Sequence, residues 1–285
     1  MAGTTDIIGW LTILTFIIHI AYLIRIYILP SRLNRYAHPA PNGDEPWALV
    51  TGASDGIGRQ FAQELAAQGF NVVLHGRNQA KLSAVEADLQ KLHPGRSFKI
   101  LVADAGAVPC KTCISDKHLS DGGRTVNFDA IRAAVEDLHL TVLINNAGGG
   151  PTNPVYAPLI ESSAEHIINN VSLNALFPLH LTRVLLPFLN RNGPALLMNI
   201  SSMADIGFPL LASYSASKQF LVNLTRVLCL EMSLDDRTPQ VEVLCVRIGK
   251  TTGVSHLKES PSFFTPSSRA MARAALIRNG LKAQT

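Results

Sequence analysis

The residues with the clearest chemical meaning are a tyrosine and a lysine four positions apart, Tyr214 and Lys218, in the segment ASYSASKQF. On a helix this spacing places both side chains on one face, so the lysine ammonium lies beside the phenol. A phenol ordinarily titrates at about pH 10, and a neighbouring cation favours its deprotonated form. We therefore expect Tyr214 to act as an acid and base, with a pKa lowered by Lys218. By itself the pattern also fits a solvated helix face.

A glycine-rich turn far upstream is the second chemical feature. The segment WALVTGASDGIGRQFAQELAAQG joins a short apolar run to three glycines and then to an apolar repeat at helical spacing. Glycines permit a tight turn, and the free N–H groups at a helix start favour an anion. We expect a nucleotide cradle here and, together with Tyr214 and Lys218, an enzyme that moves hydride. The residues expected at the cofactor are Gly52, Ser54, Asp55, Gly56, Ile57, Gly58 and Arg59.

The next expected strand, NVVLHGRN, bears on the choice of dinucleotide. A site for NAD(H) commonly has an acidic residue near the end of this strand, whereas this chain has Gly76 and Arg77. Guanidinium groups are well matched to phosphate, so Arg77 and Arg59 predict NADP(H) with its 2′-phosphate. The alternative is that both arginines are ordinary surface charges.

Four motifs occur in the order TGASDGIG, NNAG at 145–148, NISS at 199–202 and YSASK. In order and spacing they resemble the short-chain dehydrogenase/reductase family, over about Trp47 to Gly280. An apolar segment near the start and the stretch PSFFTPSSRAMARAAL make the chain similar to a membrane-bound branch. That branch contains very-long-chain 3-oxoacyl-CoA reductases and 17β-hydroxysteroid dehydrogenases.

The resemblance implies a role for individual residues. Tyr214 would protonate a carbonyl oxygen, Lys218 would hold the nicotinamide ribose, and Asn174 would hold a proton-relay water, leaving Asn169 and Asn170 as ordinary polar helix residues. Further cofactor contacts implied by the resemblance are Asp104 at the adenine, Asn146 and Gly148 at the cofactor floor, and Thr251 at the cofactor amide.

The catalytic serine has two candidates. The family's usual distance to the tyrosine indicates Ser201, while the place at the end of the NISS motif indicates Ser202. Successive side chains of a strand point to opposite faces, so only one can face the site. We favour Ser202.

The chain departs from the family pattern in three places. Ile248 stands where the family has a proline, a long polar segment occupies 105–126, and the chain ends at Thr285 before the family's usual last strand. The polar segment contains Cys110 and Cys113, a pair with His118 nearby, but no second pair of ligands follows. We expect no metal site, and the scattered cysteines fit a reducing compartment.

The N-terminal segment Ile7 to Leu29 is a largely apolar run of 23 residues, interrupted by His19 and Arg25. This length can span a bilayer, and the start lacks the features of a cleaved signal peptide. Basic residues follow the segment and none precedes it, which favours a single-pass anchor with the catalytic domain in the cytosol. The resemblance to the membrane-bound branch implies the endoplasmic reticulum as the membrane. We expect an anchor at 7–29, a linker at 30–46 and an NADP-binding catalytic domain at 47–285. A buried core helix is the alternative for the first segment.

Composition and patterning agree with one catalytic domain. Hydrophobic residues make up 47% of the chain and the net charge is +4, with no clustered basic and aromatic tract for nucleic acid. Short apolar runs alternate with helical segments, which predicts a doubly wound α/β fold with a parallel, Rossmann-type sheet. Its ligand crevice lies at the carboxyl ends of the strands, where the glycine turn, NNAG and NISS all fall.

The resulting expectation is a membrane-anchored, NADPH-dependent reductase of a lipid-like ketone. A (very-)long-chain 3-oxoacyl-CoA is the favoured substrate, and a steroid or polyketide ketone is the alternative. From another class, the chain could be a catalytically silent dinucleotide-binding membrane protein. The expected partners are the substrate, the bilayer and a second copy of the chain.

Overall fold

The computed structural model describes residues 3–28, 31–108, 125–150, 154–234, 240–254 and 257–277. Cys110, Cys113 and His118, and with them most of the polar segment 105–126, lie outside the described residues.

A parallel sheet of six strands is the centre of the domain, in the order β3-β2-β1-β4-β5-β6. The neighbouring strands β1 and β4 are far apart in sequence, so the chain winds outward from the centre in both directions. A ligand crevice is expected where β1 and β4 separate. The strands are β1 (Trp47–Thr51), β2 (Asn71–Gly76), β3 (Phe98–Val102), β4 (Leu140–Asn145), β5 (Ala195–Ser202) and β6 (Val241–Ile248).

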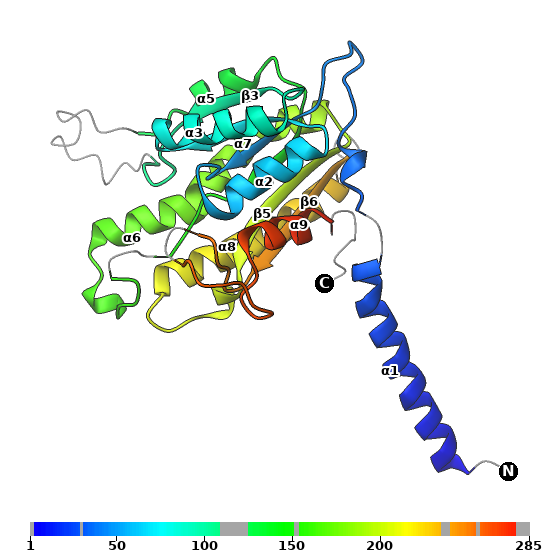
Figure 1. Cartoon of the computed structure of the whole chain (residues 1–285). Helices are drawn as coiled ribbons and strands as arrows, with labels where there is room; N and C mark the ends of the chain where they lie inside the picture. Colours follow the sequence, from blue (N-terminus) through cyan, green and yellow to red (C-terminus); the bar gives the residue numbers. More distant parts are fainter. Residues whose placement is uncertain are drawn as a thin grey trace.

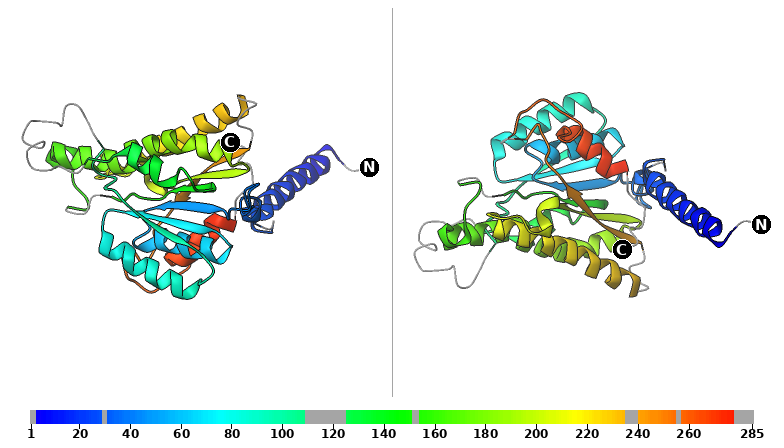
Figure 2. Two further views of the ribbon diagram at one scale, coloured as in Figure 1. Left: turned by 90° about the horizontal axis from the view of Figure 1, so that it is seen from above. Right: turned by 90° about the horizontal axis from the view of Figure 1, so that it is seen from below.

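The central strands are apolar along nearly their whole length because helices cover both faces of the sheet. Figure 2 shows the two helical layers, one blue, cyan and red and the other green and yellow. The first layer contains α2 (Gly56–Ala67), α3 (Gln79–Leu92) and α9 (Ser268–Ile277). The second contains α5 (Phe128–Val135), α7 (Phe177–Arg191) and α8 (Ala212–Leu234). The predicted doubly wound α/β fold is confirmed.

Shorter elements complete the domain around these layers. Helix α6 (Ala164–Val171) continues through a π-helical turn, η3 (Ser172–Leu176), into α7. The short 3-10 helices are η1 (Leu33–Arg35), η2 (Leu159–Glu161) and η4 (Met203–Ile206).

The N-terminal helix α1 (Thr4–Ile28) projects away from the domain (Figure 1). It has 25 residues, and at 1.5 Å per residue it is roughly 37 Å long, enough to cross a bilayer core. Large apolar side chains on its described part are exposed, including Trp10 at 71% and Ile8 at 63%. The stretch Ala164–Arg191 is also long and apolar, but 56% of its apolar window is buried in the domain. It is therefore a core helix.

The residues that follow α1 pack against the domain, although we expected a linker there. Leu33 and Tyr36 are buried in the core formed with α2 and α9. The Tyr36 hydroxyl donates to Glu242 Oε2 at 2.5 Å, and burial together with this carboxylate raises the pKa of Tyr36. The Ser31 hydroxyl donates to the Leu276 carbonyl at 3.1 Å. Contacts with the domain thus begin only a few residues beyond the end of α1.

Replacing Tyr36 with alanine should lower the free energy of unfolding by about 3–5 kcal/mol, as for other large buried rings. The matched control is Asn34→Ala, because Asn34 lies on the exposed side of the same segment. Urea unfolding of the full chain in detergent measures both. Equal stability of the two variants would mean that 31–46 behaves as a solvated linker.

Candidate active site

The turn between β1 and α2 has room only for glycine at critical positions. Gly52 and Gly56 have φ angles of 69° and 52°, a region that other residues rarely adopt. A Cβ atom on Gly58 would lie 2.2 Å from the Gly52 carbonyl oxygen. Asp55 caps α2 by accepting a hydrogen bond from the Gly56 N–H. The bare backbone at this helix start can approach a phosphate closely, so the residues present fit a dinucleotide.

Thr51 connects this turn to the NNAG loop after β4. Its hydroxyl accepts hydrogen bonds from the backbone N–H groups of Asn146 and Ala147, both at 2.8 Å. The Asn146 side chain donates in return to the Thr51 carbonyl at 2.9 Å. Sequence reasoning missed Thr51, although its position directly before Gly52 was a usable signal.

Buried side chains under the site connect four elements. Asn145 of β4 donates to Asn199 of β5 at 2.8 Å and to Thr182 of α7 at 3.0 Å. Asn199 donates in turn to Thr225 of α8 at 2.9 Å. The first asparagine of NNAG and the asparagine of NISS therefore hold the two motifs against the helices behind them.

Asn174 lies in the π-helical turn and is fully buried. Its side chain accepts from the Gly149 N–H at 3.0 Å and donates to the carbonyl oxygens of Gly149 and Asn170. Asn170 is also buried and donates to the same Gly149 carbonyl at 3.2 Å. The expectation that Asn170 is an ordinary polar helix residue is wrong, because it helps to position the loop that follows β4.

Lys218 is buried where three segments meet. Its Nζ donates to the Ile200 carbonyl at 2.9 Å. A Cβ atom on Gly148 would lie 2.8 Å from Lys218 Nζ and 2.7 Å from Asn174 Oδ1, so only a glycine fits there. Burial lowers the pKa of Lys218 to about 8, against a small opposing effect of Cys245.

Tyr214 lies one helical turn before Lys218 and is partly buried. Burial raises the pKa of its phenol, a hydrogen bond with Ser202 lowers it, and the Asp205 carboxylate raises it again, so the net direction is upward. Lys218 Nζ lies 5.8 Å from the Tyr214 ring centroid and is not among these causes. Our expectation that Lys218 lowers the pKa of Tyr214 is therefore wrong. A phenol with a raised pKa keeps its proton at neutral pH and is available to donate it.

The two candidate serines have different surroundings. Ser202 lowers the pKa of the Tyr214 phenol and caps η4 by accepting from the Ala204 N–H at 3.2 Å. Ser201 is buried, and its hydroxyl lies 2.9 Å from the Lys218 carbonyl oxygen and 3.3 Å from Asp205 Oδ2. Strand alternation thus directs Ser202 toward the tyrosine and Ser201 away from it.

Arg77 and Asp104 lie at the other end of the crevice. They line a cavity of about 940 Å³ beside the carboxyl ends of β2 and β3. Asp104 accepts a hydrogen bond from the Gly106 N–H at 3.0 Å. Arg59 instead pairs with Asp88 of α3 at 2.9 Å, a partner that the sequence did not indicate.

His75, at the end of β2, is buried under this part of the sheet. Its ring stacks on Phe177 with centroids 5.0 Å apart, and burial lowers its pKa to about 4 against an opposing effect of Asp104. His75 is therefore neutral at physiological pH and contributes to packing.

The loop after β6 lies over the glycine turn. Ile248 is buried in the core in place of the family's proline. Thr251 donates to the Gly249 carbonyl at 3.1 Å, and Val254 Cγ1 would lie 3.0 Å from a Cβ atom on Gly56. Ser54 faces the end of β2, where its hydroxyl oxygen would lie 3.5 Å from a Cβ atom on Gly76. Ile57, in the first turn of α2, packs against the core.

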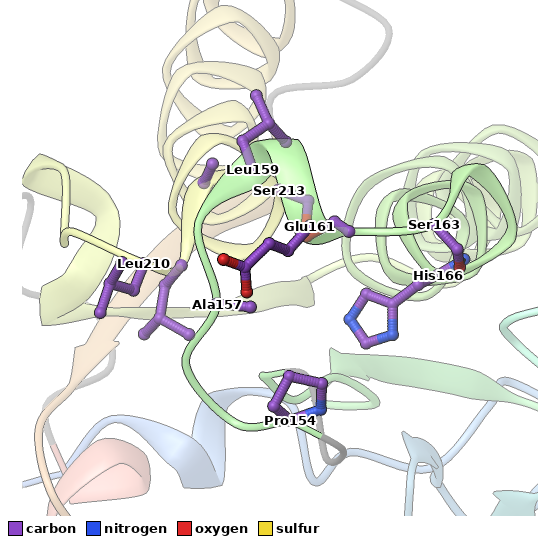
Figure 3. Close-up of a pocket in the computed structure, with 11 residues that line it drawn as sticks. Pro154, Ala157, Leu159, Glu161, Ser163, His166, Leu210 and Ser213 are labelled. Atoms are coloured by element: carbon purple, nitrogen blue, oxygen red, sulfur yellow. The ribbon is translucent and has the colours of Figure 1, made fainter.

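A pocket of about 160 Å³ lies beside the start of α8 (Figure 3). Its lining includes Ser213, the residue directly before Tyr214. Glu161 and His166 point into it from one side, and Leu210 borders it from the segment before α8. The remaining lining residues are Pro154, Ala157, Leu159, Ser162, Ser163, Leu211 and Ala212.

The family model for short chain dehydrogenases matches residues 46–110 and 124–261. The chain belongs to this family. It is therefore an oxidoreductase of the short-chain dehydrogenase/reductase type, and the expected resemblance is confirmed.

Curated relatives are similar over most of the chain. A very-long-chain 3-oxoacyl-CoA reductase of Neurospora crassa is 34% identical over 82% of this chain and 65% of its own length. A protein of the same name from Anas platyrhynchos is 33% identical over 84% of this chain and 70% of its own length. The chain thus spans about two thirds of the length of these relatives.

Solved structures show the same fold. A short-chain dehydrogenase from Sphingobium yanoikuyae in complex with NADPH has a TM-score of 0.65 and 26% identity, over 81% of this chain and 83% of that one. A bulky-bulky ketone specific alcohol dehydrogenase from Comamonas testosteroni has a TM-score of 0.64 at 23% identity, over 81% of both chains, which supports the fold alone.

The depressed pKa of Lys218 predicts a pH dependence of stability. Between pH 8 and 10.5 the unfolded chain holds this proton and the folded chain does not, so stability should rise with pH across this window. The rise from this group should be about 3 kcal/mol, and below pH 8 it should vanish.

Chemical unfolding of the wild type and of Lys218→Met at several pH values isolates this effect from other titrating groups. The difference in stability between the two proteins should change across the window. Parallel pH dependences would contradict the assignment.

Proposed function

We propose that this protein is an NADPH-dependent reductase that acts on a lipid-like ketone, with a (very-)long-chain 3-oxoacyl-CoA as its substrate. The observation that carries the proposal is the grouping of Tyr214, Ser202 and buried Lys218 at the sheet edge where the glycine turn opens. A proton donor, a second hydroxyl and a buried amine at the edge of a dinucleotide crevice suit reduction of a carbonyl group.

The proposed roles follow from the surroundings of each residue. Ser202 donates a hydrogen bond to the substrate carbonyl oxygen, and Tyr214 transfers its proton to that oxygen as the alcohol forms. Lys218 binds the ribose next to the nicotinamide. Asn174 fixes the loop after β4, and we assign the proton-relay water to the π-helical turn that contains it.

NADP(H) is the proposed cofactor, and when bound it supplies the hydride. The glycine turn of 52–58, with Ser54, Asp55 and Ile57, would hold its phosphates, and Asn146 and Gly148 would line its floor. Asp104 would contact the adenine, Thr251 the carboxamide and Arg77 the 2′-phosphate. The bound NADPH of the Sphingobium yanoikuyae neighbour supports this choice.

A lipid-like substrate is supported by the names of the relatives and by apolar side chains around the site. Ile206 is 80% exposed and Phe208 is 51% exposed on the segment between Ser202 and Tyr214. Phe208 faces Tyr156, with ring centroids 6.4 Å apart. An acyl chain can cover these side chains, and the pocket lined by Ser213 lies next to them.

The proposed location is the endoplasmic reticulum membrane, with α1 as a single-pass anchor and the domain in the cytosol. The exposed apolar surface of α1 and the arginines that follow it support this arrangement. A second copy of the chain remains a proposed partner, supported by exposed apolar residues on α8 such as Val227 and Leu230.

Replacing Tyr214 with phenylalanine should lower kcat for ketone reduction by roughly 10²–10⁴-fold, because the proton donor is lost. The assay is NADPH oxidation by the detergent-solubilised full chain with long-chain 3-oxoacyl-CoA, steroid and polyketide ketones. Ser202→Ala should also lose most of the activity. Its matched control is Ser201→Ala, which should retain more activity. Preference for a steroid would change the substrate class, and NADPH binding without turnover of any ketone would indicate a silent binding protein.

The contrast between the two arginines predicts their effects on cofactor choice. Arg77→Ala should weaken NADPH binding by roughly tenfold or more and leave NADH binding unchanged, because a charge-assisted contact to the 2′-phosphate is lost. Arg59→Ala should change NADPH affinity far less, since its guanidinium pairs with Asp88. Fluorescence titration of both cofactors measures this. Equal weakening of NADPH and NADH by Arg77→Ala would disprove the assignment.

A further inference from the structure

An ion pair with a buried carboxylate lies in the turn that follows Ser202. The Asp205 side chain is 1% exposed and is paired with Arg247 of β6, whose side chain is 46% exposed. Arg247 Nε donates to Asp205 Oδ2 at 2.7 Å, and a second guanidinium nitrogen donates to Oδ1. A carboxylate is rarely removed from water unless it is paired and hydrogen-bonded in this way.

The pair connects the segments that carry the proposed catalytic hydroxyls. Asp205 belongs to η4, the short turn that Ser202 caps, so holding Asp205 also holds the backbone next to Ser202. Ser201 Oγ lies within hydrogen-bond distance of both Asp205 and the Lys218 carbonyl oxygen. Beyond η4, the Phe208 N–H donates to Ser215 Oγ at 3.1 Å, next to Tyr214. Strands β5 and β6 and helix α8 thus meet at Asp205.

We propose that Asp205, held by Arg247, is a positioning residue that fixes Ser202 against Tyr214 and places a negative charge behind the phenol. This inference rests on the proposed function of the same site. Neither residue belongs to the motifs that carry the family resemblance, so the pair adds to the machinery that those motifs describe.

The charge has a definite effect on Tyr214. The described groups that face Tyr214 or Asp205 are Ser201 and Ser202 from β5, Lys218 from α8, and Cys245 and Arg247 from β6. Asp205 raises the pKa of Tyr214, and Arg247 balances part of the charge of Asp205. Removing the carboxylate should lower the pKa of Tyr214, and removing the guanidinium should raise it. A purely structural role would not move the two variants in opposite directions.

The test compares Asp205→Asn with Arg247→Met in the full chain. The titration of Tyr214 is followed by NMR of ring-¹³C tyrosine, with the resonance assigned by its absence in Tyr214→Phe. We expect the midpoint to shift to lower pH in Asp205→Asn and to higher pH in Arg247→Met. Arg247→Lys, which keeps the charge, should restore the midpoint toward that of the wild type.

The double variant Asp205→Asn/Arg247→Met keeps the test decisive if Arg247→Met alone fails to fold. Its midpoint should equal that of Asp205→Asn, because Arg247 acts through Asp205. In ketone reduction, the alkaline limb of the kcat profile should move to lower pH in Asp205→Asn, with KM for the ketone unchanged. Equal shifts of the midpoint in both single variants, or no shift in folded Asp205→Asn, would overturn the proposal. Because the NMR titration needs no substrate, absence of turnover by the wild type would refute the proposed function separately.

Discussion

The hydrogen bonds between Thr51 and Asn146 hold together the edge of the sheet on which the rest of the site depends. Strands β1 and β4 are neighbours in the sheet but come from distant parts of the chain, and their turns leave in different directions. Side-chain bonds across this opening keep the glycine backbone exposed and fixed. A Cβ atom on Gly58 would lie 2.6 Å from the Asn146 side-chain nitrogen, so the glycine turn packs directly against the loop after β4. The crevice is therefore preformed.

Burial explains the acid–base character of the site better than the proximity of Tyr214 and Lys218 does. Removal from water lowers the pKa of the amine and raises that of the phenol, so each group is shifted toward its neutral form. A neutral phenol suits a proton donor. The charge behind it, on Asp205, acts in the same direction. Reduction of a carbonyl group requires a tyrosine that begins with its proton, and burial and Asp205 both favour that form.

The attachment of α1 bears on how the domain meets its substrate. Leu33 and Tyr36 anchor the chain in the core a few residues after Ile28, so little free chain separates the apolar helix from the domain. With α1 in a bilayer, the domain would stay close to the membrane surface, where the proposed lipid-like substrate would be concentrated. Apolar side chains around the site, such as Ile206 and Phe208, are suited to that surrounding.

The sequence by itself determined the alternation of strands and helices, the glycine turn and the placement of Tyr214 and Lys218 on one helix, because each depends on residues that are close along the chain. Only the tertiary structure decided that Arg59 pairs with Asp88 of α3 and that Asp205 meets Arg247 of β6. It also decided the direction of the Tyr214 pKa and the different surroundings of the two serines. The physical reason is that burial, partner choice and local charge arise from contacts between distant segments, which no local pattern encodes.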